Sequence, residues 1–400
     1  MCSNLCAGSD AITHDTTDTI SATTSACKTC GGEPQVILRN RDPYCKPCFL
    51  SNCTHKFRST LGKSRLIKPG DNVLVCFSGS PASSAMIRFV LEGLSEEAHK
   101  RFLFKPTLLY IDDSVVRGIC DDHADVVNAM KNTALSYYTI PLELVYAQGP
   151  LRFNASYSND KLRQAFIETY SSFSTLTDRE GFYGLVLRQL MVRIARDNGF
   201  KKLFTGQTGT VLAARLLTTL ALGRGAQIRD ECGFVDSRDE DATILRPMRE
   251  FSSEEVELFN LHSGIQHSAK QHQSTGCHSH TSVARLTQNF VNGLQADFPS
   301  TVSTVWRTGE KLTARECSKE TCRLCRSKLD SVDPPAASAV NALKLTQRLS
   351  KMTTDERTYA HLCYACKNLS DKIASLCLPV TGEKMDGQNV LQQDESDETT

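Results

Sequence analysis

Short apolar runs alternate with longer amphipathic segments through the middle of the chain. We interpret the runs at 72–77, 107–112, 142–146 and 202–206 as strands. Apolar residues recur at helical spacing in 83–94, 114–132, 161–172, 183–197 and 211–222, which predicts helices there. Strands that alternate with helices indicate βαβ units, so the pattern predicts an α/β fold with a doubly wound, mostly parallel sheet. Right-handed crossovers would then bring the carboxyl ends of the strands, and any site, to one edge.

The segments outside this alternating region differ in composition. We expect a disordered lead at 1–26, an N-terminal cysteine module with a basic segment at 27–68, the α/β domain at 69–310, a C-terminal cysteine module at 311–378 and a disordered acidic tail at 379–400. Within the α/β domain, residues 262–282 form a low-complexity insert with five histidines.

The overall composition limits the classes of partner. Lysine and arginine total 46 against 45 aspartates and glutamates, so the net charge of +1 points to no class of partner, and any basic patch must be local. The chain lacks a charged start followed by an apolar stretch, and no run approaches the ~18 apolar residues of a membrane span. We therefore expect a soluble cytoplasmic protein that contacts no membrane.

Cysteine is the most informative residue type. Of seventeen cysteines, eight form four C-x-x-C pairs. Cys27, Cys30, Cys45 and Cys48 make an N-terminal tetrad with fourteen residues between its pairs. This spacing is close to that of ordinary zinc sites, because two C-x-x-C turns offer four thiolates to one tetrahedral metal. Two redox pairs or free cysteines are the alternatives, and Cys53 is better interpreted as a bystander.

A second tetrad lies near the C-terminal end and has wider spacing. Its two pairs, separated by thirty-seven residues, are Cys322 with Cys325 and Cys363 with Cys366. The intervening segment, AASAVNALKLTQRLSKM, looks helical, which a long zinc ribbon accommodates. Cys317 or Cys377 could replace one ligand. We expect structural zinc in both tetrads, because four cysteines leave no open coordination position.

The turn after the first strand, SGSPASS at 78–84, occupies a place where many folds hold a phosphate. Backbone N–H groups and the start of the next helix would hold it, with Ser78, Gly79, Ser80 and Ser83 as the nucleotide-binding residues. The simpler interpretation is that Ser83 or Ser84 caps the helix. The turn is not a Walker A loop, because the lysine and the second glycine are absent.

Together these features resemble a known family. A cysteine knuckle, the basic stretch KFRSTLGK and a strand followed by SGSPAS and a helix are similar to the PP-loop ATP pyrophosphatases that thiolate tRNA. Further similar stretches are TGQTGTVLAARLL at 205–217, ALGRG at 221–225, RPMRE at 246–250 and the pairs CRLC and CYAC. The resemblance covers about residues 27–370 and implies a PP-loop ATPase-like α/β fold flanked by N- and C-terminal zinc modules.

The departures from this family concern its chemistry. An active PP-loop reads S-G-G-x-D-S, whereas Ser80 stands here at the second glycine and Ala82 at the aspartate. Ser80 adds a side chain where backbone should approach phosphate closely. The stretch GQTGTV at 206–211 lacks the histidine and acidic pair of active relatives, and GFYG at 181–184 stands where thiolating relatives carry C-x-x-C. We interpret the turn as a nucleotide-binding remnant, with ATP binding in doubt and no catalytic residue.

The resemblance implies a subunit of the cytoplasmic complex that puts sulfur on C2 of the wobble uridine, U34, of tRNA. A catalytic paralogue would adenylate the C2 oxygen with ATP and transfer sulfur from a thiocarboxylated ubiquitin-like carrier, while this chain would be non-catalytic. One alternative is an active ATP-dependent tRNA sulfurtransferase with a degenerate PP-loop, in which Asp112 or Asp113 binds a metal. Another is a zinc-dependent interaction module without a tRNA role.

The basic segment is the best sequence candidate for tRNA contact. Lys56, Arg58, Lys63, Arg65 and Lys68 place five cations within thirteen residues. Such a cluster suits a phosphate backbone, with a plain solvated surface as the alternative. The phenylalanine at 57 is expected in the core rather than against a base. The three arginines of the predicted helix 183–197 are explained as well by exposed salt bridges.

Overall fold

The computed structural model describes residues 26–312, apart from 40, 99, 118–121, 154, 156, 158–159 and 266–281, and then residues 321–329, 362, 363, 366 and 369. The chain divides into two compact units, Met1–Asn52 and Cys53–Thr400. The predicted lead at 1–26, the insert at 262–282 and the tail at 379–400 fall largely or wholly outside the described residues.

The first unit contains a small antiparallel hairpin. Strand β1 (Val36–Leu38) pairs with β2 (Asp42–Tyr44), and the long helix α1 (Lys46–Ser64) follows directly. The sequence interpretation missed α1, although Phe49, Cys53, Phe57 and Leu61 recur every four residues and all are buried. This spacing is helical, but the dense charges of 55–68 interrupt the apolar pattern between these residues.

The second unit is built on a six-stranded sheet in the order β5-β4-β3-β6-β8-β7. All neighbours are parallel except the pair β7–β8, which confirms the predicted mostly parallel α/β sheet. The strands are β3 (Asn72–Cys76), β4 (Lys105–Asp112), β5 (Tyr137–Pro141), β6 (Lys202–Phe204), β7 (Val235–Asp236) and β8 (Thr243–Leu245). The central strand β3 reads NVLVC, and Val73, Leu74 and Val75 are fully buried, as expected for a strand covered on both faces.

The connections wind around this sheet in two directions. From β3 the chain passes to β4 and β5 on one side, then crosses back to β6 on the other side of β3. The strand order therefore reverses between β3 and β6, and in such sheets a crevice opens at the carboxyl ends of the two strands.

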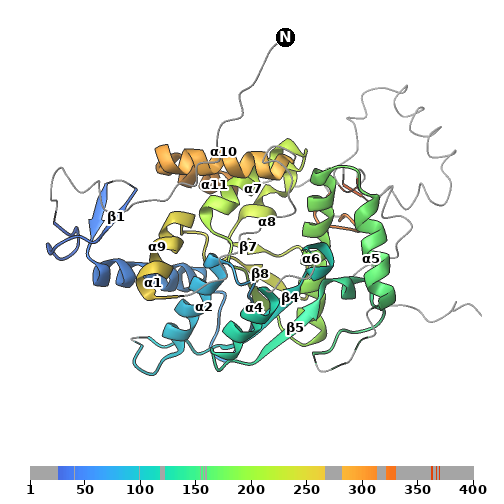
Figure 1. Cartoon of the computed structure of the whole chain (residues 1–400), viewed down its shortest axis with the longest axis horizontal. Coiled ribbons are helices and arrows are strands. Elements are labelled where there is room, and N and C mark those ends of the chain that lie inside the picture. Colours follow the sequence, from blue (N-terminus) through green and yellow to red (C-terminus); the bar gives the residue numbers. More distant parts are fainter. Residues whose placement is uncertain are drawn as a thin grey trace, which may run out of the picture. The chain divides into compact units, whose positions relative to one another are not determined.

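The helices of the second unit are more numerous than the sequence predicted. They are α2 (Pro81–Leu94), α3 (Ser114–Arg117), α4 (Asp122–Lys131), α5 (Asp160–Ser172), α6 (Leu176–Asp197), α7 (Gly209–Ala221), α8 (Ile228–Cys232), α9 (Ser253–Ser263), α10 (Val283–Asp297) and α11 (Pro299–Lys311). Figure 1 shows α7, α10 and α11 stacked together, and their mutual packing buries Trp306 against Leu212. The predicted helices 83–94, 161–172, 183–197 and 211–222 correspond to α2, α5, α6 and α7.

One predicted strand is wrong. Residues Leu142–Tyr146 form a 3-10 helix, and the neighbouring segment Tyr137–Pro141 is the strand that pairs with β4. Pro141 has no N–H for a longer ladder, and all five residues of the 3-10 turn are buried. An apolar run alone does not separate a buried strand from a buried turn, which is why the pattern misled.

Candidate functional site

A cavity of about 710 Å³ opens at the predicted edge of the sheet. Its walls come from the β3–α2 turn, the carboxyl end of β4, one face of α6 and the β6–α7 turn. These are the ends of strands on both sides of the reversal in strand order. The cavity therefore lies at the edge where the mostly parallel sheet predicted from the sequence places the carboxyl ends of the strands.

The β3–α2 turn is held by its own serines. Gly79 has φ of 76°, a left-handed conformation that glycine adopts without strain. The hydroxyl of Ser80 accepts a hydrogen bond from the N–H of Ser83 at 3.3 Å and caps α2, so the capping residue is Ser80 and not Ser83 or Ser84 as expected. The hydroxyl of Ser78 donates to Ser80 at 3.1 Å, and that of Ser83 donates to the Ser80 carbonyl at 3.0 Å.

The β6–α7 turn lies directly against the start of α2. A Cβ added to Gly206 would lie 3.1 Å from both the Cα and the backbone nitrogen of Ser83. This separation is tighter than most real contacts, so the close approach of the two turns requires glycine at this position. The structure thus brings together the two stretches, SGSPASS and GQTGTV, that the sequence interpretation compared with active relatives.

The carboxylates near the turn already have cationic or hydrogen-bonding partners. Asp113, which is 4% exposed, pairs with Arg117 and accepts a hydrogen bond from the hydroxyl of Tyr183 at 2.8 Å. Burial raises the pKa of Tyr183, and the neighbouring Asp113 raises it further, so the phenol stays protonated. Asp112 accepts from the N–H of Ser114 at 2.9 Å. Asp112 and Asp113, the candidate metal ligands of the alternative interpretation, therefore already bind groups on α3 and α6.

The thiol beside the turn is not activated. Cys76 ends β3 and lines the cavity, and its Sγ lies 3.6 Å from Sδ of Met191. Burial raises the pKa of this thiol to about 12, so it is protonated at neutral pH. Residues 181–184, GFYG, lie on α6 and contribute Gly181, Tyr183 and Gly184 to the cavity wall without any sulfur.

A network of buried ion pairs contributes several side chains to the cavity wall, and the sequence interpretation missed this network. Arg188 on α6 meets Asp236 at 3.0 Å and Asp239 at 2.6 Å, and Arg238 meets Glu231 at 2.7 Å and Asp236 at 2.6 Å. The expectation of exposed salt bridges is wrong for Arg188 and for Arg193, because these side chains are 7% and 4% exposed.

The arginines of this network lower the pKa values of its buried carboxylates in spite of their burial. Burial alone would raise the pKa of Asp236, but hydrogen bonds and charges from Arg238 and Arg188 hold it well below its usual range. Burial likewise opposes the ionised form of Glu231, and Arg215, with Arg238, lowers its pKa in spite of this. Arg246 has its pKa lowered to about 10 by burial and remains charged. The charge-dense stretch 228–241, IRDECGFVDSRDED, was the available signal, but sequence does not show that these charges are internal.

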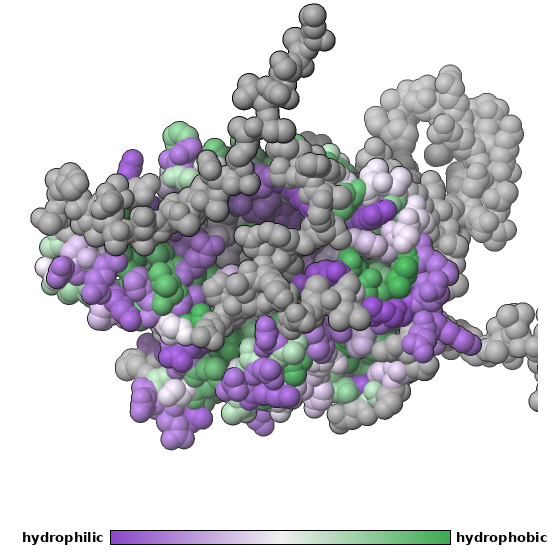
Figure 2. Space-filling view, viewed as in Figure 1, coloured by the Kyte–Doolittle hydropathy of each residue, from purple (hydrophilic) through white to green (hydrophobic). Residues whose placement is uncertain are grey.

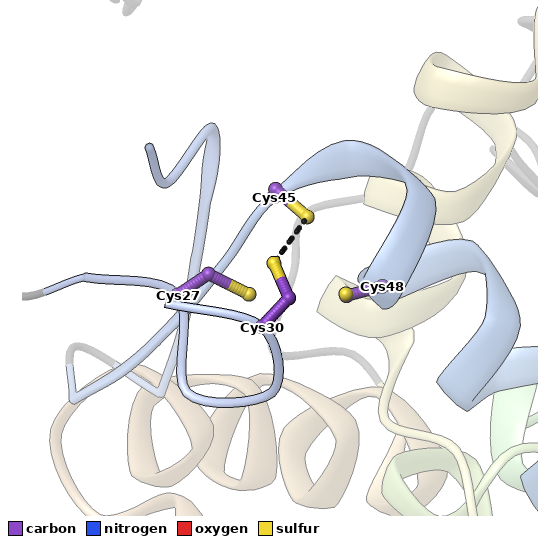
Figure 3. A group of neighbouring side chains, drawn as sticks. All are labelled: Cys27, Cys30, Cys45 and Cys48. Carbon is purple, nitrogen blue, oxygen red and sulfur yellow. Dashed lines mark hydrogen bonds between the residues drawn. The ribbon is translucent and has the colours of Figure 1, made fainter. Parts of the chain in front are cut away.

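The N-terminal tetrad forms within the first unit. The turn at Cys27 and Cys30 faces Cys45, just before α1, and Cys48, in the first turn of α1 (Figure 3). The four Sγ atoms lie within 4.8 Å of one another, and those of Cys30 and Cys45 are 3.6 Å apart. Four thiolates at 2.3 Å from a tetrahedral zinc would be separated by roughly 3.8 Å, so the cage fits such an ion.

The C-terminal tetrad is built into the core of the second unit. The Sγ atoms of Cys325 and Cys363 are 3.7 Å apart, and Cys322 and Cys366 complete a cage of the same size. Leu362 and Leu369 join the cluster that contains α6, and the side chain of Gln189 donates to the Leu324 carbonyl at 2.7 Å. Both tetrads could therefore hold a metal ion, as the sequence predicted.

Other cysteines lie apart from these cages. Cys53 is 1% exposed on α1, and burial raises its pKa to about 12, in agreement with a bystander role. Cys317 and Cys377, the proposed alternative ligands, lie outside the described residues.

The basic segment is divided by the structure. Lys56 pairs with Glu255 at 2.6 Å and lies 5.0 Å above the ring of Phe251, while Arg58 lies 5.2 Å above the ring of Phe102. Phe57 is buried and stacks on another core ring, as expected. The later cations of the segment, Lys63, Arg65 and Lys68, are exposed. Lys56 and Arg58 are thus engaged within the protein, and the exposed candidates lie farther along the chain.

Comparison with known proteins agrees with these features. The family model described as cytoplasmic tRNA 2-thiolation protein 2 matches residues 282–368. Cytoplasmic tRNA 2-thiolation protein 2-A of Xenopus laevis is 33% identical over 382 residues, covering 79% of this chain and 74% of the relative. The Homo sapiens protein of the same family is 31% identical over 384 residues, covering 80% and 74%. These relatives are named cytoplasmic, and no described helix has the length and apolar character needed to cross a membrane.

A solved structure shares the fold. The U34-tRNA thiolase NcsA from Methanococcus maripaludis, solved with its 4Fe-4S cluster, aligns with a TM-score of 0.58 at 16% identity. The alignment covers 74% of this chain and 92% of NcsA, which confirms the PP-loop-like architecture. On the identity and coverage of its relatives, this chain belongs to the cytoplasmic tRNA 2-thiolation protein 2 family.

Proposed function

We propose that the chain is a non-catalytic subunit of the complex that thiolates wobble uridine, U34, in tRNA. Membership of its family already gives it a role in tRNA 2-thiolation. One observation carries the finer proposal. A cavity is present, yet Ala82 and Ser80 stand at the phosphate turn, Asp113 is ion-paired with Arg117, and the thiol of Cys76 is protonated.

The chemistry of 2-thiolation explains what a second subunit must supply. Replacement of the C2 oxygen by sulfur needs the oxygen converted to a leaving group, which adenylation by ATP with release of pyrophosphate achieves. A sulfur nucleophile then attacks C2 and AMP departs. We assign both steps to a paralogous partner with intact motifs, which would receive sulfur from the C-terminal thiocarboxylate of a ubiquitin-like carrier. This chain would contribute stability, an interface and contacts to tRNA.

The two cysteine cages would hold zinc as structural metal. Zinc prefers tetrahedral thiolate sites, and each cage supplies four sulfurs and no open position. Bound zinc would cross-link the chain, while Cys45 and Cys48 fix the start of α1 and Cys322 and Cys325 fix a turn against α6.

One observation favours a second function. A cavity of about 710 Å³ is large enough for a nucleotide, and Gly79 keeps the left-handed turn. An active ATP-dependent tRNA sulfurtransferase would use the hydroxyls and N–H groups of Ser78 and Ser83 to hold phosphate. Calorimetric titration with ATP separates the two functions. Binding that is lost in Gly79→Asp would support the enzyme, whereas no measurable binding in either protein supports the helper subunit.

The role in the complex is tested in cells. Deletion of this chain is expected to abolish 2-thiouridine at the wobble position, measured by mass spectrometry of digested tRNA. The wild-type chain and Cys6→Ser, a matched control at a cysteine outside the four pairs, should restore it, whereas Cys45→Ser should restore much less. Undiminished thiouridine after deletion would refute the proposal.

A further inference from the structure

Two loops bring basic side chains together at the amino edge of the sheet. The N–H of Gly70 donates to the Leu103 carbonyl at 2.8 Å, and the N–H of Lys105 donates to the Asp71 carbonyl at 2.8 Å. The segment entering β3 therefore lies beside the segment entering β4. Five exposed cations occupy these two segments, and we call them the amino-edge patch: Arg65, Lys68, Lys100, Arg101 and Lys105.

The local charge of this patch is positive, although the chain as a whole is nearly neutral. Asp71 forms an ion pair with Lys202, and its carboxylate accepts a hydrogen bond from the N–H of Lys68 at 2.6 Å. Glu96 lies 3.8 Å from Arg101, and Glu97 is also exposed. Five cations against these two carboxylates leave a net charge of +3, compared with +1 for the whole chain. The hydrophilic surface over the α2–β4 connection is visible at the lower left of Figure 2.

Backbone strain marks two members of the patch. Arg65 has φ of 54° and Lys100 has φ of 62°, both in the left-handed region that favours glycine. A non-glycine residue costs about 1 kcal/mol or more in this region, so glycine would suit both turns better. Each turn nevertheless presents a long cationic side chain to solvent. These two charges therefore stand at positions where glycine would suit the backbone better, which allows their side chains to be removed without strain.

The position of the patch fits the division of labour proposed above. Parallel strands begin at one edge and end at the other, so the patch lies across the sheet from the cavity, at least about 15 Å away along the five residues of β3. A chain that performs no chemistry in its own cavity does not need to present tRNA to that cavity. We propose that the amino-edge patch binds the phosphate backbone of tRNA while the base enters the active site of the partner. This inference rests on the proposed function.

A charge-matched comparison tests the patch. The triple variant Lys68→Gln, Arg101→Gln, Lys105→Gln is compared with Lys131→Gln, Lys161→Gln, Lys311→Gln, which removes three exposed cations from α4, α5 and α11. Binding of an unmodified tRNA transcript to the full chain is measured by fluorescence anisotropy at several salt concentrations. The patch variant should bind about tenfold more weakly. The negative slope of log K against log salt should become smaller in magnitude by about 2 to 3, near 0.9 for each lost phosphate contact. The control should change affinity less than about twofold.

A second variant separates binding from folding. Arg65→Gly, Lys100→Gly relieves both strained positions, so its thermal midpoint should stay equal or rise, while its affinity for tRNA falls. A lower midpoint with unchanged affinity would mean that the side chains serve the fold, and would overturn the inference.

The remaining outcomes are also decisive. Equal losses of tRNA affinity in the patch and control triple variants, or no loss in either, would overturn the inference. Normal tRNA binding by the patch variant together with loss of a copurifying protein would also overturn it. The proposed function is tested independently of the patch, and it would be refuted if cells lacking the chain kept wobble 2-thiouridine. Retained tRNA affinity in the patch variant together with loss of thiouridine on deletion would reject the patch alone.

Discussion

The contacts of some site residues could be predicted from the sequence, and those of others could not. The tetrads were predictable because metal ligation imposes a local spacing, and Cys27 with Cys30 or Cys322 with Cys325 needs only one turn of chain. The pairing of Arg188 with Asp236 was not predictable, because it depends on how residues 48 apart in sequence meet in the fold. The strain at Arg65 is likewise invisible without backbone angles.

The contact between the two cavity turns gives a test at one residue. Gly206→Ala would place a Cβ 3.1 Å from the backbone of Ser83, and we expect a loss of about 1 to 3 kcal/mol in the free energy of unfolding. Gly184→Ala is the matched control, because that glycine lies inside α6 with no atom within 4 Å of an added Cβ. The control should be neutral or stabilising by up to about 1 kcal/mol, measured by urea denaturation. Equal effects of the two substitutions would contradict this account of the turns.

The buried carboxylates predict an acid limb in the stability profile. Arg238 and Arg215 lower the pKa values of Asp236 and Glu231 in the folded protein, so the unfolded chain binds protons more readily. The contribution of these carboxylates to the free energy of unfolding should therefore be fully present above about pH 5. It should fall progressively as the pH drops below the ordinary carboxyl pKa near 4.

The variant Asp236→Asn isolates one carboxylate of this network. It should lower stability at pH 7 by about 3 to 5 kcal/mol, because Arg188 and Arg238 each lose one of their two buried carboxylate partners, and it should flatten the decline in acid. Thermal unfolding between pH 3 and pH 8 measures both effects. An unchanged slope below pH 4 would show that Asp236 is not held ionised in the native state.

Whole elements were predicted where the pattern reports both length and environment. The strands β3, β4 and β6 and the helices α2, α5, α6 and α7 follow from alternation of apolar runs and amphipathic segments. The pattern failed at Leu142–Tyr146, where a 3-10 turn is as buried as a strand, and at α1, whose four-residue spacing is embedded in a basic stretch. The helices α10 and α11 were missed although Trp306 anchors them against α7.

The two cysteine cages should differ in their response to metal removal. Cys30 is exposed in the first unit, whereas Cys322, Cys325 and Cys366 are buried with the leucines that pack near α6. Cys45→Ser should reduce the metal content from two ions to one per chain with little effect on the main thermal transition. Cys366→Ser should also remove one ion, but should lower that transition by several degrees because the core loses a cross-link. Elemental analysis and calorimetry measure the two effects, and identical transitions in both variants would contradict the distinction.

At the scale of the whole molecule, the second unit has a PP-loop-like α/β architecture with a cavity at the carboxyl ends of its strands. The reversal of strand order between β3 and β6 places a cavity where the topology requires it. The two turns that border this cavity are closely packed, and Asp113, Arg188 and Asp236 in its wall are paired with other side chains. The amino edge of the sheet, by contrast, presents cations to solvent. This separation suits a protein that holds tRNA for a partner.

The central claim is tested most directly by reconstituting the reaction from purified components. Release of AMP and formation of 2-thiouridine are measured for this chain alone, for the proposed catalytic paralogue alone and for both together, each with ATP, tRNA and the proposed thiocarboxylated carrier. We predict no product from this chain alone and a large gain when it joins the paralogue. Product from this chain in the absence of the paralogue would contradict the account.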